Sequence, residues 1–359
     1  MNVFDSGGMK LVSYRDDVMR WLMGNAITPI CVEIEPTERC QHRCPDCQAR
    51  YSLRRSEVRN RARSGHDLDL SLLRSLWDNP PSGVVISGNT GDPLLHPHIV
   101  NLFGELSNRA IPYVLICNGE GLTPEIAAIA ANSARGIRIS LDAFDADSFC
   151  RAHGVAGGAW ERVISGVRTL VESRLGGAAG THCLLGVGYL TDERTKAGML
   201  AATTLARTLG VDYIQFRPYH YRADDIGAEL DACLELADDK FQVLASGQKY
   251  SSAGDVTRSY SICHASWFYS VIDARGDVYI CCHHVGNPAG RWGSLQDTDW
   301  QSLLASRLRR QVLSGFQTDN CVPLCRLDIH NRTLELVRSA AEVPRVALAD
   351  DVLAHRMFL

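Results

Sequence analysis

Six short apolar segments, alternating with helical patterns, constrain the fold of this 359-residue chain most strongly. The apolar segments are residues 30–35, 83–87, 113–117, 137–141, 183–190 and 213–217, and the main helical patterns are residues 68–77, 98–108, 124–133, 159–173 and 194–208. Strands that alternate with helices at this spacing form parallel sheets with right-handed crossovers. The sequence therefore predicts an α/β fold built on a parallel sheet.

Polar residues stand where these predicted strands end. Ligands of parallel α/β sheets and barrels bind at the carboxyl ends of the strands, so we predict the functional site at this edge. The candidates are Thr90, Gly91, Asp92, Asn118, Ser140, Asp142 and Arg217. Gly91 and Asn118 also suit ordinary turns. Arg217, followed by Tyr219 and His220, needs an anionic or hydroxyl partner if it projects into a barrel, which makes it a candidate contact for a substrate or a cofactor.

Glu33 and Glu35 alternate with apolar residues in the first predicted strand. Side chains two positions apart lie on the same face of a strand, so the two carboxylates share a face. That face either points into the barrel, which makes both residues candidate catalytic groups, or is solvated.

Cys40, Cys44 and Cys47 follow this strand with the spacing C-x₃-C-x₂-C. Thiolates are the soft ligands of iron–sulfur clusters, and three of them from one loop leave one iron of a cubane open to a small molecule. A structural zinc site usually takes four protein ligands, often in separate C-x₂-C pairs, and this loop lacks that pattern. Charged residues between the cysteines argue against three buried core thiols. The loop therefore predicts a cluster.

Cys263, Cys281, Cys321 and Cys325 form a second set with the pattern C-x₁₇-C-x₃₉-C-x₃-C. Residues 267–280 have the aromatic and β-branched content of a hairpin, which brings its two ends together. Four such thiols could hold zinc or a second [4Fe–4S] cluster. Cys282 should point away from Cys281 because neighbouring residues on a strand face opposite sides. It is either a core thiol or a hydrogen-atom donor or acid–base group.

The three-cysteine loop and the strands around it resemble the radical S-adenosylmethionine (radical SAM) enzymes, and the resemblance covers most of the chain. It implies a partial (β/α)₆ TIM-like barrel in which Cys40, Cys44 and Cys47 hold a [4Fe–4S] cluster. The open iron of that cluster binds the amino and carboxylate groups of S-adenosylmethionine (SAM), and an electron then produces a 5′-deoxyadenosyl radical. One position departs from the family pattern, since Asp46 stands where an aromatic residue usually precedes the third cysteine.

The same resemblance implies roles for the strand-end residues. Residues 90–93, Thr-Gly-Asp-Pro, resemble the family's Gly-Gly-Glu-Pro element, which meets the methionine amino group of SAM. Asn118, Ser140 and Asp142 fall where the family contacts the ribose hydroxyls and the methionine carboxylate. The hairpin and the late cysteine pair resemble the shortened auxiliary-cluster module called twitch, a small α+β unit. Because no cysteine follows Cys325, we expect one auxiliary [4Fe–4S] cluster.

Five regions follow from these patterns. We expect an N-terminal helix within residues 1–26, the radical SAM core barrel at 27–222, a helical and acidic connection at 223–255, the twitch module at 256–335 and a C-terminal tail at 336–359. The arginine-rich stretch at 50–63 is either a solvated helix face or a surface that steers an anionic substrate or an acidic electron donor such as flavodoxin or ferredoxin.

Composition excludes several classes of partner. A net charge of −4 and a pI near 6.3 argue against binding nucleic acid by broad phosphate attraction. No apolar run approaches the ~18 residues that span a bilayer, so no membrane association is expected. The N-terminus lacks a signal-peptide pattern, and 13 cysteines cannot all pair. We therefore expect a cytoplasmic protein with reduced thiols.

The resemblance to the twitch module points towards family members that act on carbohydrates and aminocyclitols in antibiotic pathways. The resemblance therefore predicts a radical SAM oxidoreductase that abstracts hydrogen from a small polyhydroxylated substrate, a sugar, aminocyclitol or nucleoside, in secondary metabolism. Oxidation of an alcohol to a ketone is the first choice, with the auxiliary cluster accepting the second electron. The alternatives are decarboxylation of a sugar acid such as cytosylglucuronate, epimerisation and peptide modification. A regulatory protein with zinc or a cluster is the non-enzymatic alternative.

Overall fold

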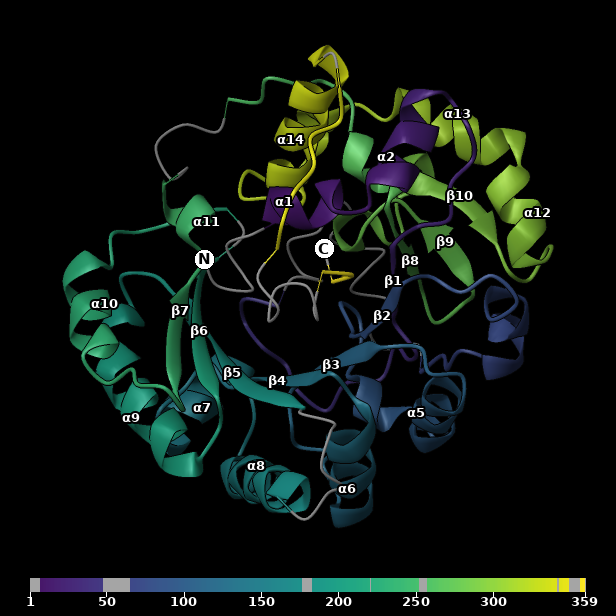
Figure 1. Cartoon of the computed structure of the whole chain (residues 1–359). Helices are drawn as coiled ribbons and strands as arrows, with labels where there is room; N and C mark the ends of the chain where they lie inside the picture. The colour runs from purple at the N-terminus through teal and green to yellow at the C-terminus, as the bar shows by residue number, and fades with distance from the viewer. Residues whose placement is uncertain are drawn as a thin grey trace.

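The structure is a computed structural model that describes residues 7–47, 65–175, 183–219, 221–251, 257–340, 342–348 and 356–358. Its strands form a 10-stranded curved sheet with the order β10-β9-β8-β1-β2-β3-β4-β5-β6-β7. Helices α5, α6, α8, α9 and α10 cover the outer side of this arc (Figure 1). The strands are β1 (Cys31–Ile34), β2 (Gly83–Ile86), β3 (Tyr113–Cys117), β4 (Gly136–Ser140), β5 (Leu184–Thr191), β6 (Tyr213–Pro218), β7 (Gln242–Ala245), β8 (Tyr269–Ile272), β9 (Asp277–Tyr279) and β10 (Arg291–Ser294).

The predicted α/β fold is confirmed, because all six predicted strands are present as β1–β6 and pair in parallel. A seventh parallel strand, β7, pairs with β6. It lies in the connection that was predicted to be helical, and among the residues described there only α10 (Gly227–Leu234) and the short α11 (Gly247–Ser251) are α-helical. The core of the sheet is apolar and largely buried, whereas strand residues such as Val114 and Ile116 line the interior of the barrel and are only partly buried.

Five helices connect the strands of the barrel, and two of them, α6 and α7, begin at residues whose side chains cap the helix. The five helices are α5 (Ile99–Asn108), α6 (Pro124–Ser133), α7 (Ala146–His153), α8 (Ala159–Leu175) and α9 (Met199–Leu209). Thr123 accepts a hydrogen bond from the Ile126 amide at 3.2 Å, and Asp145 and Ser148 form a capping box. The predicted helix at 68–77 is instead the 3₁₀ helix η1 (Leu70–Leu76).

The C-terminal part continues the sheet of the barrel. β8 pairs in parallel with β1, and β9 and β10 follow as antiparallel strands. Residues 300–315 form two helices, α12 (Trp300–Ala305) and α13 (Arg307–Gly315), because Ser306 is extended and its side chain caps α13 through the Arg309 amide at 3.0 Å. The hairpin of this module therefore lies directly beside the first strand of the barrel.

Both ends of the described chain meet this sheet. The N-terminal part contains α1 (Gly7–Val12), which was not predicted, and α2 (Arg15–Leu22). Helix α14 (Asp328–Ser339) crosses the predicted boundary between the twitch module and the C-terminal tail, and residues 342–348 are not helical. Residues 356–358 lie inside the arc of the sheet (Figure 1), where Lys10 Nζ donates to the Phe358 carbonyl at 3.2 Å.

Two features of the sequence analysis cannot be placed in the fold. The arginine-rich stretch at 50–63 and His220 lie outside the described residues. No helix in the described ranges combines the length and the apolar character needed to cross a bilayer.

Candidate active site

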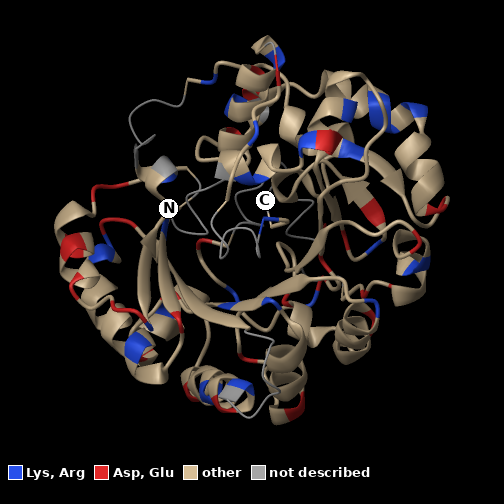
Figure 2. Ribbon diagram, viewed as in Figure 1, with Lys and Arg blue, Asp and Glu red and all other residues tan. Residues whose placement is uncertain are grey.

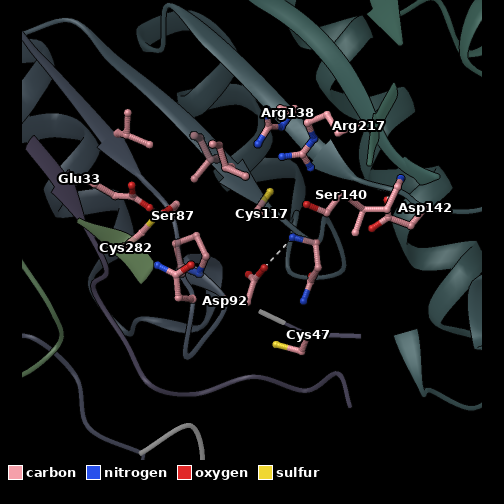
Figure 3. A pocket seen from close by; sticks show the side chains of 18 of the residues that line it. Glu33, Cys47, Ser87, Asp92, Cys117, Arg138, Ser140, Asp142, Arg217 and Cys282 are labelled. Atoms are coloured by element: carbon pink, nitrogen blue, oxygen red, sulfur yellow. Dashed lines mark hydrogen bonds between the residues drawn. The ribbon is translucent and has the colours of Figure 1, made fainter. Parts of the chain in front are cut away.

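A cavity of about 1260 Å³ occupies the inside of the barrel. Residues of the cysteine loop and of the carboxyl ends of the strands line one side of it, and α11, Cys282, His283 and α14 contribute others. Figure 3 shows Cys47 and Asp92 on one side of this space, and Arg138 and Arg217 on another. All six predicted cofactor residues line it: Thr90, Gly91, Asp92, Asn118, Ser140 and Asp142.

The cysteine loop brings three thiols together at the mouth of this cavity. Cys40, Cys44 and Cys47 all line it; the charges of Cys40 and Cys47 act on the Cys44 thiol, and the charge of Cys47 acts on the Cys40 thiol. Burial raises the pKa of the Cys44 thiol, so the thiol keeps its proton until a metal ion takes the proton's place on the sulfur. Three converging soft donors fit a cluster with one open iron.

A chain of hydrogen bonds supports Cys44 from behind. His42 Nε2 lies 2.6 Å from Glu120 Oε2, and His42 Nδ1 lies 3.1 Å from His153 Nδ1. His153 Nε2 donates to the Leu141 carbonyl at 2.9 Å, which turns Nδ1 towards the Cys44 thiol at 3.6 Å. His42, Cys44 and His153 offer ligand atoms within 4.8 Å of one another, and Cys40 and Cys47 also act on Cys44. The sequence offered no partner for His153.

The turn after β2 is fastened to the cysteine loop through backbone atoms. The Asp92 amide donates to the Arg39 carbonyl at 2.7 Å, and a Cβ at Gly91 would lie 2.7 Å from the same oxygen. Only glycine allows this approach. The Asp92 carboxylate accepts from the Leu94 amide at 3.0 Å and from the Asn118 amide at 2.6 Å (Figure 3, dashed line). Burial raises the pKa of Asp92 to about 6.

Asn118 and Asp142 present groups that are suited to a polar ligand. The Asn118 Oδ1 atom accepts from Gln41 at 3.2 Å and from the Glu120 amide at 3.0 Å, whereas its buried Nδ2 has no partner among the described residues. Asp142 has a positive φ of 48°, a conformation that aspartate tolerates better than most residues, and its carboxylate accepts from the Leu190 amide at 2.7 Å. Both residues therefore stand at the cavity edge with defined orientations.

The two glutamates of β1 differ in their surroundings. Glu33 lines the cavity and accepts from Arg326 at 2.8 Å and from the hydroxyls of Ser87 and Tyr269. Glu35 is fully buried, does not line the cavity and accepts from Asn89. Burial, and then the charge of Glu33, raise the pKa of Glu35 well above its usual range. The alternative that the two glutamates lie on a solvated strand face is therefore wrong. A catalytic role for Glu35 is not supported, because its side chain does not reach the cavity.

Arg217 points into the cavity, as expected, and lies beside Arg138 of β4 (Figure 3). Arg138 was not a candidate, although a charged residue within the apolar segment 137–141 was a signal in the sequence. Its Nη1 donates to Gln215 Oε1 at 2.9 Å. Figure 2 shows basic residues on the strands of the sheet as well as on the helices around it.

The second cysteine set also converges. The charges nearest to the buried Cys281 thiol include those of Cys263, Cys321 and Cys325, so the hairpin and the late cysteine pair meet as predicted. Asn331 Nδ2 donates to Cys263 Sγ at 3.5 Å. Cys282 lines the barrel cavity instead, near Glu33 and Ser87 (Figure 3), and the four other cysteines do not. The two neighbouring thiols therefore face different sites.

His284 makes a directed contact with this second site. Asn287 Oδ1 accepts from the Ala289 amide at 3.1 Å, which orients the Asn287 amide so that its Nδ2 donates to His284 Nδ1 at 2.9 Å. The His284 proton must then be on Nε2, which lies 3.6 Å from Cys321 Sγ. Burial lowers the pKa of His284 to about 4, so the ring is neutral.

We expect His284→Leu to lower the reduction potential of the auxiliary site, because a hydrogen bond to a ligand sulfur stabilises the more negatively charged reduced state. A loss of about 1 kcal/mol for one electron corresponds to about 40 mV. A redox titration followed by electron paramagnetic resonance measures this shift. His98→Leu, at an exposed position, is the control, and an unchanged potential in His284→Leu would exclude the hydrogen bond from tuning the site.

Comparisons with known families agree with this geometry. The family model described as the radical SAM superfamily matches residues 34–197, and the SPASM model, described as an iron–sulfur cluster-binding domain, matches residues 263–327. No curated protein sequence matches the chain.

Solved structures share the fold at low sequence identity. SuiB of Streptococcus suis bound to S-adenosylmethionine has a TM-score of 0.61 and 16% identity over 84% of this chain and 72% of its own. The native enzyme anSMEcpe with bound AdoMet has a TM-score of 0.54 and 13% identity over 85% of this chain and 88% of its own. BtrN in complex with AdoMet and 2-DOIA reaches a TM-score of only 0.41, which is too low to support an argument.

Proposed function

Because the chain belongs to the radical SAM superfamily and carries a SPASM iron–sulfur domain, we propose that it oxidises an alcohol group of a small polyhydroxylated substrate to a ketone. The superfamily supplies a SAM-binding [4Fe–4S] cluster, which with SAM generates a 5′-deoxyadenosyl radical, and the SPASM domain supplies an auxiliary iron–sulfur site. Cys40, Cys44 and Cys47 would hold the first cluster. Cys263, Cys281, Cys321 and Cys325 would hold the auxiliary cluster.

The positions of Cys281 and Cys282 support oxidation as the reaction. Cys282 lines the same cavity as Cys47 and Asp92, and its covalent neighbour Cys281 belongs to the auxiliary site. A substrate in this cavity therefore lies between the two sites. Oxidation removes a hydrogen atom from carbon, a proton from the hydroxyl group and one electron. The 5′-deoxyadenosyl radical would take the hydrogen atom and become 5′-deoxyadenosine, a base of the cavity would take the proton, and a cluster held by Cys263, Cys281, Cys321 and Cys325 would take the electron.

The residues of the chain provide the binding environment. Asp92, Asn118, Ser140 and Asp142 would orient SAM, and the polar groups deeper in the barrel would orient the substrate. Glu33 is already engaged by Arg326, Ser87 and Tyr269, so it organises the cavity wall instead of acting as a free base. A cytoplasmic flavodoxin or ferredoxin would supply the electron that starts each turnover.

Peptide modification is the second candidate. SuiB has been solved bound to its precursor peptide SuiA, and anSMEcpe with the peptides Cp18Cys and Kp18Cys. Decarboxylation or epimerisation of a small substrate is redox-neutral and, unlike the oxidation of an alcohol, needs no electron acceptor. In an epimerisation, Cys282 would return a hydrogen atom to carbon.

Deuterium labelling tests the proposal. With sugars and aminocyclitols deuterated at the oxidised carbon, each turnover should consume one SAM, transfer deuterium to 5′-deoxyadenosine and give a product that has lost two hydrogens. Cys282→Ala should keep most of this activity, because its thiol takes no part in oxidation. If Cys282→Ala consumes SAM without forming product, and the wild-type product made in heavy water carries deuterium on carbon, the reaction is epimerisation.

A further inference from the structure

Four cationic side chains meet in the inner part of the cavity. Arg138 comes from β4, Arg217 from β6, Lys249 from α11 and Arg326 from the segment before α14, and all four line the cavity. Burial, followed by the charge of Arg217, lowers the pKa of Arg138 to about 9 and that of Lys249 to about 8. Arg326 also acts on both. These charges are therefore close enough to repel one another in a poorly solvated space.

The acceptors within the protein do not balance these charges. Glu33 pairs with Arg326, which also lies 4.4 Å over the Tyr269 ring, and Gln215 accepts from Arg138. No acceptor among the described residues bonds to the side chain of Arg217 or to Lys249 Nζ. Asp142 is the carboxylate whose charge acts most on Arg217. That single carboxylate faces several cations and already accepts from a backbone amide.

Buried orphan donors point to the same place. The Nε atoms of Arg138, Arg217 and Arg326 are inaccessible and have no partner among the described residues. Such groups are rare in native proteins because each carries an uncompensated desolvation cost, and an unpaired buried charge costs more still. Several unpaired donors around one cavity are therefore stabilised only when a molecule with hydrogen-bond acceptors binds there.

We infer that the substrate carries a carboxylate or phosphate group and that Arg138, Arg217 and Lys249 bind it. Planar guanidinium groups with free N–H donors suit both oxyanions, and a flexible ammonium adds a third contact. That the bound anion is the substrate rests on the proposed function. The inference narrows the polyhydroxylated substrate to an acidic sugar, a sugar phosphate or a related anionic nucleoside.

The methionine carboxylate of SAM is a less suitable occupant. The leading electrostatic neighbours of Cys40 and Cys44, besides each other and Cys47, are Asp92, Glu120 and Asp142, and none of the four cations. Lys249 instead interacts with Cys325 of the auxiliary set, and Arg326 follows Cys325 in the sequence. This end of the cation cluster therefore lies towards the auxiliary site, whereas Arg138 and Arg217 lie nearer to Asp142.

Binding of simple anions to the anaerobically reconstituted holoenzyme tests this site without requiring turnover. Isothermal titration calorimetry would compare inorganic phosphate, D-glucuronate and neutral D-glucose. We expect at least one anion to bind roughly tenfold or more tightly than glucose, because charge-assisted hydrogen bonds add to its affinity. Tight binding of phosphate alone indicates a phosphate ester, and tight binding of glucuronate alone indicates a carboxylate.

Arg138→Gln, Arg217→Gln and Lys249→Gln should each weaken anion binding by roughly tenfold, and Arg207→Gln, which removes an exposed arginine paired with Asp238, should leave it unchanged. Removing one of several repelling cations should leave the melting temperature unchanged or raise it, so a stable variant that has lost the anion supports the site. Equal binding by the variants and the wild type, no anion binding, or a parallel tenfold loss of SAM affinity overturns the inference. Deuterium transfer from a neutral sugar would contradict this inference alone and leave the proposed oxidation standing.

Discussion

Replacing Cys40, Cys44 and Cys47 together by alanine should abolish SAM cleavage and leave the iron of the auxiliary site in place. The three thiols converge at the mouth of the cavity and have no role in the second cysteine set. With one four-iron cluster at each site, the triple variant should retain roughly half of the iron. Iron and sulfide analysis after anaerobic reconstitution, with quantification of 5′-deoxyadenosine, measures both effects.

Cys150→Ala is the matched control for this variant. Cys150 is a half-buried free thiol in α7 that lines neither site, so its loss should change neither the iron content nor SAM cleavage. Unchanged iron in the triple variant would mean that the loop holds no cluster. Iron reduced to near zero would mean that the two sites fold together.

The barrel was predictable because its signals are local. Runs such as 83–87 and 113–117 are apolar and bounded by turn residues, and their carboxyl ends carry the polar groups that line the cavity. The strand β7 was missed because it is only four residues long and follows an acidic stretch without a regular pattern. The pairing of β8 with β1 joins segments more than 200 residues apart, and no local pattern encodes it.

The site residues that the sequence did not reveal also depend on contacts between distant segments. Arg138 could have been noticed as a charge inside an apolar strand, but Lys249 and Arg326 become site residues only when α11 and the segment before α14 reach the barrel. The contact between His153 and Cys44 spans 109 residues and that between His284 and Cys321 spans 37. Spacing identifies ligands that share one loop, whereas supporting residues come from elements that meet only in the folded protein.

Replacing Cys281 by alanine should cost both iron and stability. Cys281 is one of three buried members of the auxiliary set, and the other three thiols are among the charges that act on it. The set draws on the hairpin, the 3₁₀ turn at Cys263 and the loop before α14. Metal and cluster binding energy is folding energy in a small module, so this variant should unfold at a markedly lower temperature. It should also lose roughly half of the iron, the complement of the loss in the loop variant.

Cys282→Ala is the matched control for Cys281→Ala, because the two thiols are adjacent in sequence and both are buried. The cavity-facing Cys282 should be replaceable with full iron content and little change in melting temperature. The loss of stability in Cys281→Ala should extend to the barrel, since β8 covers the edge of β1, and loosening the module exposes that strand. Limited proteolysis would then cut both the hairpin and the barrel in Cys281→Ala. If instead the iron stays complete, or zinc fills the site after reconstitution with iron and sulfide, these four cysteines do not hold a second cluster.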